Sequence, residues 1–462
     1  MSQDRNLNDG AVGRALFAVS APMTLGILGV LSVGLADAYF LAKAGATELA
    51  AISYIFPVIA TLTSLSIGLA AGTNAVISQA IGQGEDGADR DRLTLHAMML
   101  AFLLSCLTAV LFYFGAPMVF SLMGARDAVL DAVMGYIRFW CLSFPFLVTG
   151  MALNAAFRAA GKTVVAASVM LGQSIVNIAL NPVFIFGFAS IPEMGADGAG
   201  LATLVARIAG FLGVLVYGCW VGAVCLNCAP FRHLATSFRR IGRIGAPAAF
   251  SNAINPAGMA IVTAAIATIG DAAVAGFGAA TRVQSLLLVP MLALSSGIGP
   301  VVGQAWGADM QQRARDAMRL AFLWCIAIGF CVATILFIFA EPIADVMTSG
   351  AEEAKFAVSY MRIASWGFFC YGILITANAA MNARDRALWS MSVSAVRIFV
   401  IYVPLTWFGV WVAGYTGMLF AAVAANVIGA WIALIAAHSV GLVHLDWRVV
   451  RGPAERLRGA FA

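Results

Sequence analysis

The chain has 462 residues, of which 62% are apolar and only 11% are charged. Soluble domains average about 45–50% apolar and ~25% charged residues, so this composition excludes a water-soluble globular protein. One membrane-spanning helix needs roughly 20 predominantly apolar residues, and the chain can supply ten or more such helices. The formal net charge of +5 belongs to loops and gives no reason to expect nucleic-acid binding.

Long apolar runs with helical character follow one another in two groups of six. The first group is Leu16–Leu41, Leu49–Ile81, Leu93–Phe120, Ala132–Phe157, Thr163–Phe186 and Gly198–Ala223. The second group is Ile244–Ile269, Val274–Trp306, Ala317–Ala340, Ala357–Met381, Leu388–Trp411 and Gly417–His438. We therefore predict an all-α integral membrane protein with twelve transmembrane helices. Residues 1–225 are expected to form an N lobe, residues 226–243 a basic cytoplasmic linker, and residues 244–462 a C lobe with a basic cytoplasmic tail.

The positive charges alternate between the two sides of this arrangement. Of the 27 Lys and Arg residues, 19 fall in the termini and in every second loop, whereas five fall on the opposite side. Cytoplasmic loops of membrane proteins accumulate Lys and Arg. We therefore expect a multi-pass protein of the inner (plasma) membrane with both termini in the cytoplasm.

The two groups of helices resemble each other. When the chain is shifted by 225 positions, residues Gly72–Gln79 align with Gly297–Gln304, and Gly82 aligns with Gly307. Six spans are an even number, so two such repeats have the same orientation in the membrane. Parallel repeats of this kind occur in secondary transporters. The repeat predicts two lobes around a central cleft.

One acidic residue lies well inside an apolar run. Asp37 is near the outer end of the first helix, and acids at membrane depth are costly and usually face an internal path or a partner. At a rise of ~1.5 Å per residue, Asn181 on the fifth helix and Thr203 on the sixth helix lie at about the same depth as Asp37. Asn177 is one turn deeper than Asn181 on the same face. These four side chains are expected to form an ion- or proton-coupling site.

The second repeat does not contain these polar residues. The positions that correspond to Asp37, Asn177, Asn181 and Thr203 are all apolar: Val262, Phe399, Val403 and Ala422. The site is therefore expected in one lobe only. A buried carboxyl favours its neutral form, so Asp37 can bind a proton when the cleft faces outward. A cation that competes with the proton for the cavity would give antiport.

Arg207 leaves an alternative open. It follows Thr203 by one helical turn, on the same face. If Arg207 reached Asp37, the two would form a buried ion pair and the carboxylate would stay ionised. Arg207, Arg282 and Arg397 also leave open whether the cargo is cationic or anionic.

Several motifs resemble one transporter family. They are Ala36-Asp37-Ala38-Tyr39-Phe40 with the following Gly45–Ile52, the Gln79-x-x-Gly82 end of the second helix, and Asn177-x-x-x-Asn181-Pro182. In this order and spacing they resemble the multidrug and toxic compound extrusion (MATE) family, most of all its DinF-like branch. The resemblance implies export of lipophilic, mostly cationic, small molecules in exchange for H⁺ or Na⁺ by alternating access.

The resemblance also implies site residues. It assigns Asp37, Asn177 and Thr203 to an ion site in the N lobe. The fourth position departs from the branch, because Asn181 stands where an aspartate is common. The NorM-like branch instead has acids in its seventh and tenth helices. Here those helices offer Asn252, Asn255, Tyr371 and Asn378 with no acid, which argues against a sodium site in the C lobe.

Two other functions remain as alternatives. A flippase for lipid-linked precursors, from the same superfamily, would be expected to have more spans and a strongly basic cavity. A membrane-embedded enzyme would need an acidic metal-binding cluster or a His/Glu set, and the sequence offers no such group. We therefore expect no catalytic residues, no metal and no cofactor besides the coupling ion. The expected partners are small lipophilic molecules and the lipid bilayer, and the protein is expected to act as a monomer.

Overall fold

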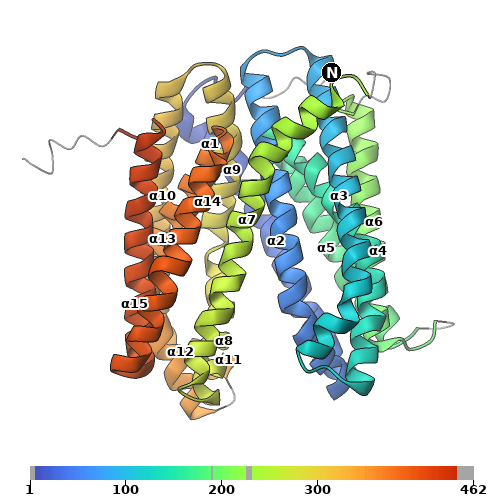
Figure 1. The fold of residues 1–462 in the computed structure, drawn as a ribbon, viewed down its shortest axis with the longest axis vertical. Helices are drawn as coiled ribbons and strands as arrows, with labels where there is room; N and C mark the ends of the chain where they lie inside the picture. Colours follow the sequence, from blue (N-terminus) through green and yellow to red (C-terminus); the bar gives the residue numbers. More distant parts are fainter. Residues whose placement is uncertain (1–5, 189–190, 225–230, 349, 445–462) are drawn as a thin grey trace, which may run out of the picture.

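The computed structural model describes residues 6–188, 191–224, 231–348 and 350–444. Within these ranges the chain is almost entirely helical (Figure 1), and the sole pairing of extended backbone is an isolated bridge between Phe188 and Ile191. The helices of the first half are α1 (Val12–Ala44), α2 (Ala46–Gly82), α3 (Gly87–Leu122), α4 (Asp127–Ala159), α5 (Thr163–Ile185) and α6 (Gly195–Val221).

The second half has more, shorter elements. They are α7 (Leu234–Ala267), α8 (Asp271–Leu287), α9 (Val289–Gly307), α10 (Gln311–Ile338), α11 (Ala340–Met347), α12 (Ala351–Ile363), the 3-10 turn η1 (Ala364–Gly367), α13 (Phe368–Ala383), α14 (Ala387–Ala395), the π-helical segment η2 (Val396–Tyr402) and α15 (Val403–Ser439). Several of these elements follow one another directly and form broken spans. For example, α8 and α9 are bent by 48° and cross as one span.

The described residues contain twelve transmembrane passes. Ten helices are long and apolar enough to cross a membrane, and the bent pair of α8 and α9 makes eleven. One of the ten, Ala387–Ser439, has 53 residues, which at ~1.5 Å per residue is far longer than the ~30 Å of a bilayer core. The helix breaks at Gly414, whose φ is +59°. Gly409 and Gly417 then pack backbone to backbone across the break, so this stretch is two passes and the prediction of twelve is confirmed.

Part of the predicted linker is helical. Residues 226–243 were expected to connect the halves, but α7 begins at Leu234 and includes the second part of that segment. The run looked like a loop because its arginines are close together in the sequence. In the structure, Ile241 and Ile244 are buried, which gives the first turns of α7 an apolar side to pack. Residues 225–230 lie outside the described residues.

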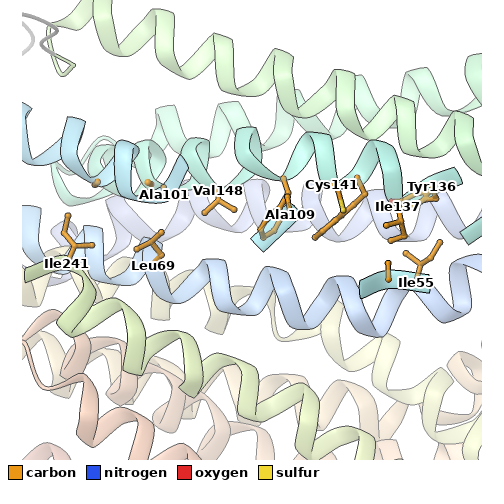
Figure 2. Packing of buried hydrophobic residues seen from close by; sticks show 14 of the residues in the cluster. Ile55, Leu69, Ala101, Ala109, Tyr136, Ile137, Cys141, Val148 and Ile241 are labelled. Atoms are coloured by element: carbon orange, nitrogen blue, oxygen red, sulfur yellow. The ribbon is translucent and has the colours of Figure 1, made fainter. Parts of the chain in front are cut away.

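Each half has its own apolar core. In the first half the largest cluster joins α2, α3 and α4, and Figure 2 shows Leu69, Ala101, Cys141 and Val148 among its members. In the second half two clusters join α8–α10, α12–α15 and the segments between them. At roughly 25 cal/mol per Å² of apolar area removed from solvent, such clusters stabilise soluble proteins. In a bilayer, close packing of small residues takes over much of that role, and alanines are abundant in these clusters.

The first helix of each half exchanges partners at one end. Leu16 and Val19 of α1 belong to a core cluster of the second half. Conversely, Ile241 and Ile244 of α7 belong to the core of the first half, and Ile241 is visible beside Leu69 in Figure 2. Because α1 and α7 cross from one half to the other (Figure 1), the halves are interlocked at that end.

The two halves meet at one end of the molecule and diverge towards the other (Figure 1). We call the end with loops 83–86, 160–162, 308–310 and 384–386 the Arg-rich end. There, α2 and α7 approach backbone to backbone: a Cβ atom added to Gly72 would lie 2.7 Å from the Ile241 carbonyl oxygen. Arg240 and Glu85 also form an ion pair of 3.6 Å between the halves. The structure is therefore closed at the Arg-rich end.

Candidate ion-coupling site

The four predicted site residues lie together within the first half. Asp37 is on α1, Asn177 and Asn181 are on α5, and Thr203 is on α6. Asp37 is seven residues from the end of α1, and Asn181 is four residues from the end of α5. At ~1.5 Å per residue the site is about 6–12 Å from the helix ends that are opposite to the Arg-rich end. All four side chains are buried.

A chain of hydrogen bonds connects the four side chains. The Asn181 Nδ2 donates to Asp37 Oδ1 at 2.5 Å and lies 3.4 Å from Asn177 Oδ1. Asn177 Nδ2 donates to Thr203 Oγ1 at 3.2 Å, and the Thr203 hydroxyl donates to the backbone carbonyl of Ala199 at 3.0 Å. A hydrogen bond to an ionised acceptor is stronger than one between neutral groups. The network therefore holds Asp37 in one orientation through Asn181.

One acceptor of the network has no donor. Asn181 Oδ1 is buried and makes no hydrogen bond to any described residue. A buried polar atom without a partner is unusual in native structures and calls for an explanation, such as a functional role. The described residues contain no group of three or more His, Cys, Asp or Glu side chains that could hold a metal ion. Asp37 is thus a single carboxyl among neutral polar groups.

Arg207 does not bond to Asp37. Its guanidinium donates to the Ser143 hydroxyl at 2.6 Å and lies over the Trp140 ring, 5.4 Å from the ring centroid. No ion pair within 4.0 Å links Asp37 to a described Lys or Arg residue. The buried ion pair that the sequence left open is absent here, although Arg207 remains close enough to interact with Asp37 electrostatically.

Helix α4 supplies residues that the sequence analysis did not include in the site. The buried Tyr136 side chain interacts with the Thr203 hydroxyl and lies within electrostatic range of Asp37. Trp140 and Ser143, one and two turns further along α4, hold Arg207. The signal for Tyr136 was available, because Tyr136-Ile-Arg138 matches Tyr360-Met-Arg362 in the second repeat. That match pointed to a shared structural role and not to this site.

The second half has a polar centre of opposite charge. Arg397, in the π-helical segment η2, is only 7% exposed. Its guanidinium donates to Asn255 Oδ1 at 3.1 Å and to Asn426 Oδ1 at 2.8 Å, and it lies 5.3 Å from the centroid of the Tyr371 ring. Gly429 makes room for the arginine stem, since a Cβ atom there would lie 2.8 Å from Arg397 Cδ. π-helical turns are frequently found at functional sites.

This centre has no acidic partner among the described residues. Arg397 forms no ion pair, and its Nε is buried without an acceptor. Asn255 and Tyr371 are neutral residues in the two helices where the NorM-like branch has acids. The structure places a fixed cation between them, which makes a sodium site at this position electrostatically unfavourable.

Comparison with known proteins finds the same internal repeat. The MatE family model matches the chain twice, over residues 22–183 and 247–408, so that the two matched segments are 225 positions apart. The chain belongs to the MatE family. It is 32% identical over 437 residues to a protein of Shewanella oneidensis described as an FAD transporter, covering 93% of this chain and 95% of that one. It is also 24% identical to the probable multidrug resistance protein NorM of Thermotoga maritima, covering 87% and 84%.

The fold agrees with solved structures of the same family. A mutant of the Vibrio cholerae MATE transporter VcmN matches with a TM-score of 0.88 at 27% identity, covering 93% of this chain and 96% of that one. VcmN in its bent form matches with a TM-score of 0.87 at 27% identity. MatE proteins are transporters and not enzymes. The predicted family and the two-repeat membrane fold are therefore confirmed, and the chain is a multi-pass membrane transporter.

Proposed function

We propose that this MatE transporter exports small organic molecules by proton antiport, with Asp37 as the proton carrier. The observation that carries the proposal is the hydrogen bond from Asn181 to the buried Asp37 carboxyl. The site needs only one proton to become neutral, because Asp37 is its single acid. A site with a second carboxyl would suit Na⁺ better, since hard cations prefer several oxygen ligands.

The orientation of Asn181 also supports a proton over Na⁺. The amide presents its NH₂ group, and not its oxygen, to Asp37. A sodium ion coordinated directly by Asp37 Oδ1 would lie against this positive edge of the amide dipole. A proton on Asp37 meets no such conflict, because the amide can keep donating to the same oxygen.

The proposed cycle uses the two halves as moving bodies. With the Arg-rich end in the cytoplasm, as its charge suggests, the structure corresponds to the outward-open side of the cycle. A proton that enters from outside neutralises Asp37 and weakens the hold on a bound cargo cation. Release of the proton on the cytoplasmic side then restores the charge for the next cargo. Because the two ligands bind in alternation, each drives the release of the other.

The test is efflux of a fluorescent cationic dye from drug-sensitised cells. We expect Asp37→Asn to abolish coupled efflux at unchanged expression, because the amide has no proton to exchange. Asp271→Asn is the matched control, since Asp271 is an exposed acid in the first turn of α8. Normal efflux by the Asp37→Asn variant would remove Asp37 from the mechanism.

A second candidate function is export of an anionic cargo. Arg397 is a buried cation without an acidic partner, and its neighbour Tyr371 offers an aromatic face. Guanidinium groups bind phosphates through paired hydrogen bonds, and one relative is described as an FAD transporter. For this function we expect Arg397→Met to lower export of flavin dinucleotide at least tenfold and to leave export of the cationic dye unchanged. Equal losses for both compounds would contradict it.

A further inference from the structure

Two hydrogen bonds between the halves are related by the internal repeat. Gln79 of α2 donates from Nε2 to the Ala383 carbonyl oxygen at 2.6 Å. Gln304 of α9 donates from Nε2 to the Ala159 carbonyl oxygen at 2.7 Å. Gln79 and Gln304 differ by 225 positions and the two alanines by 224. Each half therefore reaches across to the other with the same side chain, to the same kind of acceptor.

The acceptors are carbonyls at helix ends. Ala159 is the last residue of α4, and Ala383 is the last residue of α13. The last carbonyls of a helix have no partner inside it and carry the negative end of the helix dipole. Among the described residues, no backbone N–H beyond these helices donates to either oxygen. Each glutamine thus satisfies an acceptor that its own half leaves unpaired.

Glycines allow α2 and α9 to approach each other closely. A Cβ atom on Gly82, three residues after Gln79, would meet the backbone of Gln304, with the Gln304 carbonyl carbon at 2.9 Å. A Cβ atom on Gly307, three residues after Gln304, would meet the backbone of Gln79, with its carbonyl carbon at 3.0 Å. The same four-residue element, Gln-x-x-Gly, thus supplies both the donor and the close approach, once from each half.

The N-terminal segment adds to one of the two contacts. The Leu7 backbone N–H donates to Gln304 Oε1 at 3.0 Å, and Asn8 Nδ2 donates to the Gln304 carbonyl oxygen at 3.3 Å. Leu7 is fully buried, as is Gln304. The Gln304 amide is thus fixed at both of its ends, whereas Gln79 remains partly accessible.

We propose that Gln79 and Gln304 are paired latch residues that hold the Arg-rich end of the transporter closed. Both hydrogen bonds connect the two halves, so both break when the halves separate at this end. The freed helix-end carbonyls and amides can then bind water, which keeps the difference between the closed and open states small. This inference rests on the proposed alternating-access cycle for its role in transport, but the latch itself concerns only the balance between two conformations.

The test measures that balance directly by electron-spin distance measurements. Spin labels are attached at Ala88→Cys on α3 and Gln312→Cys on α10, two exposed positions of the Arg-rich end in different halves, in a background with the native cysteines replaced. The protein is studied in lipid nanodiscs without cargo or ion gradient. A hydrogen bond that folding exchanges for water contributes a modest amount, so we expect each of Gln79→Ala and Gln304→Ala to raise the open-to-closed ratio about 2- to 10-fold.

The double variant and the difference between the two latch residues make the test more specific. Because one opening motion breaks both bonds, the two effects should multiply to roughly 4- to 100-fold. Gln304→Ala should have the larger effect, since it also removes the side-chain acceptor of the Leu7 N–H, whereas the bond from Asn8 to the backbone carbonyl remains. Gln79→Glu and Gln304→Glu keep the side-chain size, remove the donor and place a carboxylate against the carbonyl, so they should open the end further even if an alanine variant folds poorly.

Gln311→Ala is the matched control, because the Gln311 side chain bonds to Arg315 within α10 at 3.3 Å and does not cross between the halves. An unchanged distance distribution in the latch variants, or an equal change in the control, overturns the proposal. Since no cargo or gradient is used, this result is independent of the role of Asp37. A latch that opens as expected beside an Asp37→Asn variant with normal efflux would refute the proposed coupling and leave the latch intact.

Discussion

Gly72→Ala tests how tightly the two halves close. A Cβ atom at this position would lie 2.7 Å from the Ile241 carbonyl oxygen and 2.8 Å from the Gly245 nitrogen, and both neighbours are backbone atoms of α7. An ordinary contact begins at 3.4 Å, so α2 and α7 must separate by about 0.7 Å. Overpacking of this kind costs typically 1–3 kcal/mol. Since the cost arises only when the Arg-rich end is closed, the ratio of closed to open molecules should fall about 5- to 150-fold.

Cross-linking across the same interface measures the population of the closed state. Glu85→Cys and Arg240→Cys replace the ion pair between the halves, whose charged atoms are 3.6 Å apart. In a background without other cysteines, we expect the rate of disulfide formation to fall when Gly72→Ala is added, by at most the factor by which the closed-to-open ratio falls. Gly242→Ala is the control, because a Cβ atom there meets nothing within 4 Å. An unchanged rate with Gly72→Ala, in folded protein, would refute the idea that this glycine contact belongs to the closed state.

Three further substitutions test the site and the N-terminal segment. Asn181→Leu removes the donor that holds Asp37, and a charge-assisted hydrogen bond contributes about 1.5–3 kcal/mol. Coupled dye efflux should therefore fall at least tenfold at equal expression. Efflux at the wild-type rate would contradict a role for this hydrogen bond. Thr203→Val should lower efflux severalfold without abolishing it, because Asn177 loses its acceptor while Asp37 keeps Asn181. Arg313→Ala removes the guanidinium that donates to the Leu7 carbonyl oxygen at 2.7 Å, and we expect a lower thermal unfolding midpoint in detergent with no loss of dye binding.

The membrane fold was largely predictable because composition and hydropathy act over long segments. Twelve apolar runs appear in the sequence, and the break at Gly414 was predicted between Trp411 and Gly417. The start of α7 was not predicted, because a dense run of arginines resembles a loop. Ile241 in that segment packs against the first half, and this contact depends on how the halves interlock, which the sequence does not show.

The candidate site was predicted in part. Counting residues from the helix ends placed Asp37, Asn181 and Thr203 at one depth, and the structure brings them together; their role in ion coupling stays a prediction. Sequence could not decide the partner of Arg207, because depth says nothing about which neighbouring helix faces a side chain. That choice depends on α4, whose Ser143 receives the guanidinium.

The contacts between the halves were the least predictable feature. The repeat of Gln79 and Gln304 is visible in the sequence, where it indicates only that the two halves are alike. Their acceptors are backbone carbonyls, which any residue provides, so no sequence pattern marks Ala159 or Ala383 as partners. Only the arrangement of the two halves reveals them.

The most direct test of the central claim is efflux from proteoliposomes under one gradient at a time. The purified protein is reconstituted with a fluorescent cationic dye, and a proton gradient or a sodium gradient is imposed separately, for the wild type and for Asp37→Asn. We predict that the proton gradient alone drives transport by the wild type and that neither gradient drives it in the variant. Transport driven by sodium alone, or proton-driven transport that persists in Asp37→Asn, would contradict the account.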